Sequence, residues 1–213
     1  MHYSRCARAV LAPLLVAACG GSSSSAVIAL PTSSAPSPSS SASPSPAARH
    51  ETPVPAEHNP PGDIPDNLAF VAYSNAAGRY RFTHPEGWAE QTHGADVLFT
   101  DKLNGVTATT GTATSPPTAA SARQQDVPAL QSSQAAFELR TITTVTGPAG
   151  SGVRIVYRRN SSPDPVTGRQ YRDEVERYEL VNHGREVVLE LYGPVGADNV
   201  DAYRTMVQSL RIG

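Results

Sequence analysis

A long stretch rich in serine, proline and alanine limits which part of this chain can fold. It runs from Gly20 to about Pro65, has few aromatic residues, and contains runs such as Ser37-Pro38-Ser39-Ser40. Such a composition cannot bury enough apolar surface to offset the entropy that folding removes. We therefore expect a disordered tether that ends at residue 66. Residues 67–213, about 147 residues, are a normal size for one folded domain.

The N-terminus has the features of a bacterial signal peptide. Arg5 and Arg8 precede an apolar run from Ala9 to Ala18, which is too short to span a bilayer as a helix. The run ends in Leu15-Val16-Ala17-Ala18-Cys19-Gly20 and resembles the lipobox of bacterial lipoproteins. The resemblance implies that residues 1–18 are removed and that the Cys19 thiol carries lipid, with fatty acids such as palmitate. Stable anchoring takes more than one acyl chain. The alternative is an ordinary secretory peptide with a chance cysteine.

The cysteine content and the net charge exclude several kinds of function. Cys6 is the only other cysteine and lies in the segment predicted to be removed. The mature chain would then have no disulfide, no cysteine-ligated zinc and no cysteine nucleophile. The formal net charge is −2, which argues against nucleic acid as an electrostatically driven partner.

Alternation of apolar and polar residues predicts a series of β-strands in the second part of the chain. We expect two hairpins with tight turns, one at Asn104-Gly105 and one at Asn182–Arg185. Trp88 follows the turn Pro85-Glu86-Gly87, and we expect it to be a buried core residue. The predicted strands are 79–84, 96–100, 106–110, 139–145, 153–157, 171–181 and 186–192.

Two segments have the pattern of helices. In the first, Asp126 can cap the helix, with Pro128 in its first turn and with Val127, Leu130 and Phe137 near one face. The second begins near Asp198 and carries an apolar stripe that should pack across the sheet. The predicted stripe consists of Val200, Tyr203, Val207 and Leu210.

Two of these segments resemble the PsbP family. The likeness rests on Tyr80-Arg81-Phe82-Thr83-His84-Pro85-Glu86-Gly87-Trp88 and on the closing segment Tyr203 to Arg211. It implies an α+β fold, an α/β/α sandwich with a central antiparallel sheet and helices on both faces. Together with the lipobox and the tether, the chain looks like the lipid-anchored PsbP-like proteins of high-GC bacteria.

The sequence offers little support for catalysis, and we predict that the protein is not an enzyme and has no cofactor. It contains none of the Gly-x-Ser-x-Gly, His-Glu-x-x-His or Gly-x-x-x-x-Gly-Lys motifs. The histidines do not have metal-ligand spacing, so we predict no metal site. Two alternatives stay open. His84 and His93 could converge with Asp96, and Glu174 with Glu176 could form a cation site or an acid/base pair on one side of a strand.

An arginine-rich surface is the candidate contact site. Arg154 and Arg158 should share one face of a strand, and with Arg177 they could form an unpaired cluster that holds an anion or a partner protein. The alternative, which we favour, is cross-strand pairing of these arginines with glutamates on a solvated face.

Two functional classes fit these features best. We favour a non-catalytic binding or assembly module, anchored by lipid at the outer face of the cell membrane, that engages another envelope protein. The alternative is a carrier of a lipid or an anionic metabolite, with a pocket between sheet and helix. An enzyme directed at the cell wall is a third, weaker alternative.

Overall fold

The computed structural model describes residues 51–58 and 60–213. The predicted signal peptide, Cys19 and most of the predicted tether lie outside the described residues. In the part that the structure describes, no helix is both long enough and apolar enough to cross a membrane.

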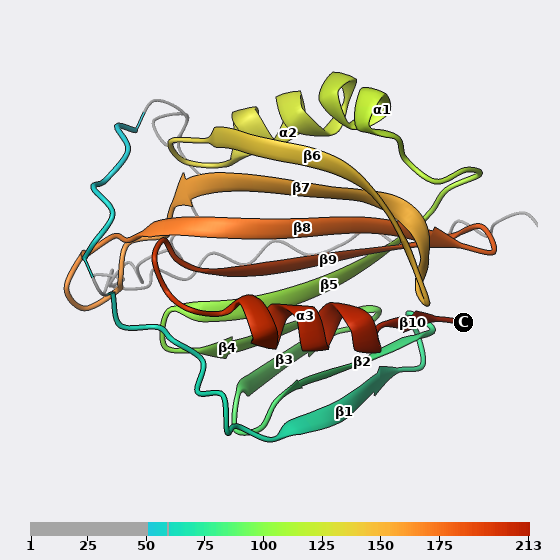
Figure 1. The fold of residues 1–213 in the computed structure, drawn as a ribbon, viewed down its shortest axis with the longest axis horizontal. Coiled ribbons are helices and arrows are strands. Elements are labelled where there is room, and N and C mark those ends of the chain that lie inside the picture. Colours follow the sequence, from blue (N-terminus) through green and yellow to red (C-terminus); the bar gives the residue numbers. More distant parts are fainter. Residues whose placement is uncertain (1–50, 59) are drawn as a thin grey trace, which may run out of the picture. The chain divides into compact units, whose positions relative to one another are not determined.

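A seven-stranded antiparallel sheet forms the centre of the domain (Figure 1). Its strands are ordered β3-β4-β5-β9-β8-β7-β6, and a smaller sheet is ordered β1-β2-β10. The strands of the large sheet are β3 (Ala89–His93), β4 (Asp96–Asp101), β5 (Asn104–Thr112), β6 (Glu138–Gly147), β7 (Gly150–Asn160), β8 (Arg172–Asn182) and β9 (Arg185–Pro194). Those of the small sheet are β1 (Phe70–Asn75), β2 (Tyr80–Pro85) and β10 (Arg211–Ile212).

Helices cover both faces of the large sheet, which confirms the predicted α+β sandwich. They are α1 (Ala119–Gln124), α2 (Asp126–Ser133) and α3 (Val200–Ser209). We call the face under α1 and α2 the α2 face, where Leu130 packs with Ile155 and Tyr157. We call the opposite face the α3 face, where Met206 and the small sheet pack in a second core cluster. In Figure 1, α3 crosses in front of the sheet, whereas α1 and α2 lie beside β6.

The predicted strands are all present, but one turn was placed wrongly. Lys102 and Leu103 form the β4–β5 turn, and Lys102 has a φ of 51°. Asn104 is instead the first residue of β5, and its buried side chain donates to the Gly62 carbonyl at 2.8 Å. A Cβ at Gly105 would lie 2.3 Å from the Tyr192 ring. This Asn-Gly pair therefore serves tertiary packing rather than the turn.

The helices differ from the prediction in detail. α1 was not predicted, although Thr118 caps it by accepting from the Ser121 backbone N–H. α2 ends at Ser133, so Phe137 packs on the core from beyond the helix.

The stripe predicted on the last helix is correct in part. In α3, Val200 is 61% exposed and Tyr203 is buried, and Leu210, just after the helix, is also buried. Val207 is partly buried against the core. The buried face of the helix also includes Ala202 and Met206. It is thus rotated away from Val200.

The folded domain begins before residue 67, where the sequence analysis placed its boundary. Ile64 is buried in the core, and its backbone N–H donates to Asn199 Oδ1 at 2.8 Å. Residues 51–57 also form hydrogen bonds with the domain. A boundary drawn from average composition misses these contacts because each depends on a single side chain.

Candidate functional site

The less favoured interpretation, an unpaired cluster of Arg154, Arg158 and Arg177, is contradicted, because in the described part of the chain each of the three pairs with a glutamate. On the α3 face, Arg154 binds Glu176 with two hydrogen bonds of 3.0 and 2.5 Å, and Arg158 Nε donates to Glu174 at 3.0 Å. Cross-strand pairing with glutamates, the favoured alternative, is therefore confirmed for these two residues. It also occupies both glutamates that were considered as a cation site or an acid/base pair.

Arg177 lies on the opposite face of the sheet. It is the register partner of Ile155, whose side chain packs in the core of the α2 face. Its guanidinium donates to Glu179 at 2.6 Å and to Glu190 at 3.2 Å. The sheet thus separates Arg177 from Arg154 and Arg158.

His84, His93 and Trp88, all within the described residues, do not form a site either. His84 is buried and stacks on Phe99, with 3.7 Å between ring centroids, and burial lowers its pKa. His93 and Asp96 are partners at the β3–β4 turn, and Trp88 is a core residue as predicted. Within 51–58 and 60–213, no group of three or more potential metal ligands is placed to hold an ion.

A network of charged side chains lies on the α2 face instead. Glu190 is at its centre and accepts hydrogen bonds from Arg159, Arg177 and Tyr157 at 3.2, 3.2 and 3.0 Å. Arg159 also donates to Gln134 just beyond α2, at 2.9 Å. We call this group the buried charge network, because its side chains are at most 25% exposed. Its charged members are Arg159, Asp173, Arg177, Glu179 and Glu190.

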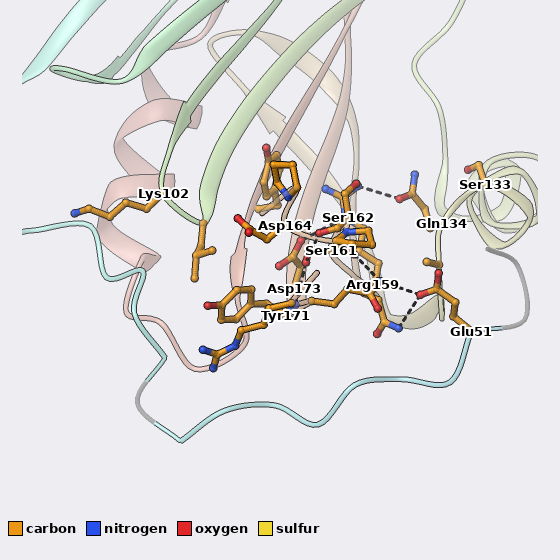
Figure 2. Close-up of a pocket in the computed structure, with 18 residues that line it drawn as sticks. Glu51, Lys102, Ser133, Gln134, Arg159, Ser161, Ser162, Asp164, Tyr171 and Asp173 are labelled. Atoms are coloured by element: carbon orange, nitrogen blue, oxygen red, sulfur yellow. Dashed lines mark hydrogen bonds and ion pairs between the residues drawn. The ribbon is translucent and has the colours of Figure 1, made fainter. Parts of the chain in front are cut away.

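The network opens at one end into a cleft of about 500 Å³. Arg159, Asp173 and Tyr192 contribute to its lining from β7, β8 and β9. The walls come from the end of α2, the β4–β5 turn, and the loop 161–171 that joins β7 to β8. Figure 2 shows Lys102 and Glu51 on opposite sides of this cleft, with Asp173 and Arg159 between them.

Asp173 gives the cleft a carboxylate of unusual chemistry. It is buried, and burial raises its pKa from 3.8 to about 6, although nearby Arg159 acts in the opposite direction. The nearest atoms of this pair, Asp173 Oδ2 and Arg159 Nε, are 3.7 Å apart. That is too long for a good hydrogen bond. The carboxylate is therefore poorly compensated for its lost solvation.

Two further features fix the geometry of the cleft. The Arg159 guanidinium lies 5.0 Å from the centre of the Tyr192 ring, a cation–π contact that holds both planar groups in place. The loop 161–171 is held by its own hydrogen bonds. Asp164 accepts from Val166 and from Thr167, and these bonds lower the pKa of Asp164.

Sequence reasoning missed the network and the cleft, although one signal for the network was available. Alternation along β8 places Asp173 and Arg177 on the face opposite Glu174, and along β7 it places Arg159 opposite Arg158. Once Arg154 and Arg158 are paired with Glu174 and Glu176 of β8, the same alternation places Arg177 on the other face of the sheet. The contributions of α2 and of the loop had no such signal, because they depend on tertiary packing.

Comparison with known proteins leaves the family open. No family model and no curated protein matches this chain. Cyanobacterial PsbP (CyanoP) of Synechocystis is 17% identical with a TM-score of 0.47, over 73% of this chain and 100% of that chain. The Ran-binding protein Mog1p of Saccharomyces cerevisiae is 10% identical with a TM-score of 0.44, over 68% and 96%.

LpqN of Mycobacterium tuberculosis, a protein involved in cell envelope biogenesis, is 12% identical with a TM-score of 0.39, over 78% and 93%. Identities and TM-scores this low carry no statement about the family or function of this chain. The resemblance to the PsbP family stays a prediction, and the α+β fold rests on the order and packing of the strands and helices described above.

Proposed function

We propose that this protein is a non-catalytic binding module, anchored by lipid at the outer face of the cell membrane, which holds part of another envelope protein in the cleft. The observation that carries the proposal is the cleft itself. Its volume of about 500 Å³ lies within the usual range for binding sites, roughly 300 to 1,000 Å³. Its lining comes from several elements that are fixed by hydrogen bonds before any ligand arrives.

The chemistry of the lining favours binding over catalysis. Among the described residues, those that line the cleft include no histidine and no cysteine. Arg159 and Arg169 are each paired with a glutamate, and the carboxylate of Asp164 is used within its own loop. In the described part of the chain, Asp173 forms its ion pair with Arg159, at 3.7 Å, and a guanidinium does not give up a proton to act as an acid/base partner.

Membrane anchoring is the part of the proposal that rests on sequence alone. The lipobox and the serine- and proline-rich segment support it. With Cys19→Ser, we expect the protein to move from the membrane to the soluble fraction and to lose labelling by a palmitate analogue. A variant that still sediments with membranes and still incorporates label would contradict lipidation at Cys19.

One observation also favours a small-ligand carrier. The cleft lies between the sheet and the end of α2, which is where a carrier would hold its cargo. Its lining is rich in serine, asparagine, glutamine and charged residues, however, and this does not suit a lipid chain. A polar metabolite is the form in which this second function fits the site.

Site-directed photo-crosslinking in native membranes tests the proposed function. A photoreactive amino acid at Ser162, exposed on the wall of the cleft, should give a discrete protein adduct. The same amino acid at Gln91, exposed on β3, is the matched control and should give none. Equal adducts at both positions, or no adduct at Ser162, would refute a binding role for the cleft.

A further inference from the structure

The segment that precedes the domain docks at the cleft as an extended peptide. We call residues 51–57, Glu51-Thr52-Pro53-Val54-Pro55-Ala56-Glu57, the strap. It forms no helix or strand, yet its two acidic residues and its backbone are bound to the rim of the cleft. Glu51 is itself one of the residues that line the cleft (Figure 2).

Asn160 binds the backbone of the strap. Its side-chain amide donates to the Thr52 carbonyl at 2.9 Å, and its side-chain oxygen accepts from the Val54 N–H at 3.0 Å. In an extended chain, the carbonyl of one residue and the N–H of the residue two places later point to the same side. A carboxamide carries both an acceptor and a donor, so Asn160 can bind any extended backbone of this form.

The side chain of Asn160 is held in place before the strap arrives. Asn160 is 4% exposed, its backbone N–H donates to the Ala135 carbonyl at 2.9 Å, and its side-chain oxygen accepts from Arg172 at 3.3 Å. These contacts fix its position at the end of β7. The site is therefore built by the domain and not by the strap.

The ends of the strap are bound through their charge. Glu51 accepts from Gln170 at 3.0 Å and from Asn160 at 3.2 Å, and Glu57 pairs with Arg169. The two prolines between them lack a backbone N–H and favour an extended conformation. The rim thus binds an extended backbone, restricted by proline, with an acidic residue near each end.

We infer that this rim is a peptide-binding site, that the strap is its internal occupant, and that the partner supplies a segment of the same chemistry. This inference rests on the proposed function and names its ligand as an extended, proline-containing, acidic peptide. A partner segment displaces the strap because it can continue into the cleft and contact Asp173 and Tyr192. The internal tether gives the strap a high effective concentration, which keeps weaker ligands out.

The test uses the full chain with Cys19→Ser, in a second form with residues 51–57 replaced by a glycine-serine sequence of equal length. The probe is a fluorescent synthetic peptide with the sequence Glu51 to His58, and fluorescence anisotropy measures its binding. We expect at least about tenfold tighter binding to the strap-replaced form, because no internal occupant competes. Equal affinity for both forms, or no binding to the strap-replaced form up to about 1 mM, would overturn the inference.

Variant peptides test the backbone contact without any change to the protein. A peptide with Val54→Pro lacks the N–H that binds Asn160, so its affinity should fall by at least about fivefold. A peptide with Val54→Ala keeps that N–H and should bind like the original. Unchanged affinity of the Val54→Pro peptide would show that Asn160 does not bind the backbone, contrary to the inference.

The outcome separates this inference from the proposed function. If the peptide fails to bind but Ser162 still gives its adduct in membranes, the peptide chemistry is wrong and the binding role of the cleft stands. If both experiments fail, both proposals are overturned.

Discussion

Arg158 and Arg159 are neighbours in β7, yet they lie in opposite environments. The Arg158 side chain is 28% exposed and pairs with Glu174, which is 44% exposed. The Arg159 side chain is 17% exposed and contacts Glu190 and Asp173, which are 12% and 4% exposed. α2 and the loop 161–171 flank the α2 face. An arginine–carboxylate pair on that face is therefore less accessible to water than one on the α3 face. The burial of a residue determines how its charge affects stability, and neighbouring residues in one strand can differ in burial.

The carboxyl groups on the two faces differ in the same way. Burial raises the pKa of both Asp173 and Glu179 on the α2 face. On the α3 face, Glu174 and Glu176 are directly satisfied by arginines. Burial of carboxylates on the α2 face therefore costs a free energy of desolvation that the α3 face avoids. The cleft lies where this free-energy cost is high.

The largest difference should appear when one partner of the buried network is removed. Arg177→Met leaves Glu179, 4% exposed, without its arginine. We expect the free energy of unfolding to fall by about 3 to 5 kcal/mol, the usual effect of leaving one buried charge unpaired. Arg158→Met on the α3 face is the control and should cost less than about 1 kcal/mol. Similar losses in urea unfolding would abolish the distinction between the faces.

A smaller effect, of opposite sign, should follow from the loss of the buried carboxylate in the cleft. Burial raises the pKa of Asp173 to about 6 in the folded protein, against 3.8 for an unperturbed aspartate. The folded state therefore holds a proton that the unfolded state releases, and Asp173 weakens folding as the pH rises from about 4 to 6. Asp173→Asn should raise the free energy of unfolding at pH 7 by about 2 to 3 kcal/mol.

The pH dependence provides the check on this prediction. In Asp173→Asn, the decrease in stability between pH 4 and 6 should be smaller than in the unsubstituted protein. Thermal unfolding at a series of pH values measures it. An Asp173→Asn protein that is less stable at pH 7 would mean that the carboxylate is well solvated or well paired.

The smallest effect concerns the exposed pair on the α3 face. A double-mutant cycle of Arg158→Ala and Glu174→Ala should give a coupling energy below about 1 kcal/mol. The coupling should decrease further in about 1 M salt, because the pair is accessible to ions. A coupling of several kcal/mol that is insensitive to salt would place this pair in the same class as the buried network.

Local patterns predicted most of the sheet. Tight turns such as Asn182–Arg185 and the alternation along β7 and β8 follow from nearest neighbours, and both match the structure. The prediction of a turn at Asn104-Gly105 was wrong because the Asn104 side chain donates a hydrogen bond to Gly62, which is distant in the sequence. A turn motif cannot reveal a tertiary hydrogen bond.

The site was harder to predict than the sheet. The sequence singled out Arg154, Arg158 and Arg177, but it did not show which charged side chains of β7 and β8 would be buried. That depends on α2, whose contribution includes Gln134 just after the helix. The strap was hidden for another reason, since a serine- and proline-rich composition predicts disorder even where Asn160 binds two backbone groups.

Under the proposed function, hydrogen exchange of the protein in native membranes and after purification in detergent would test directly whether the cleft binds a partner. We expect additional protection in native membranes across 133–135 and 160–171, the segments that line the cleft, and unchanged exchange across β3. If protection in 160–171 is the same in both samples, or if the added protection falls on β3 instead, the cleft is not where this protein meets its partner.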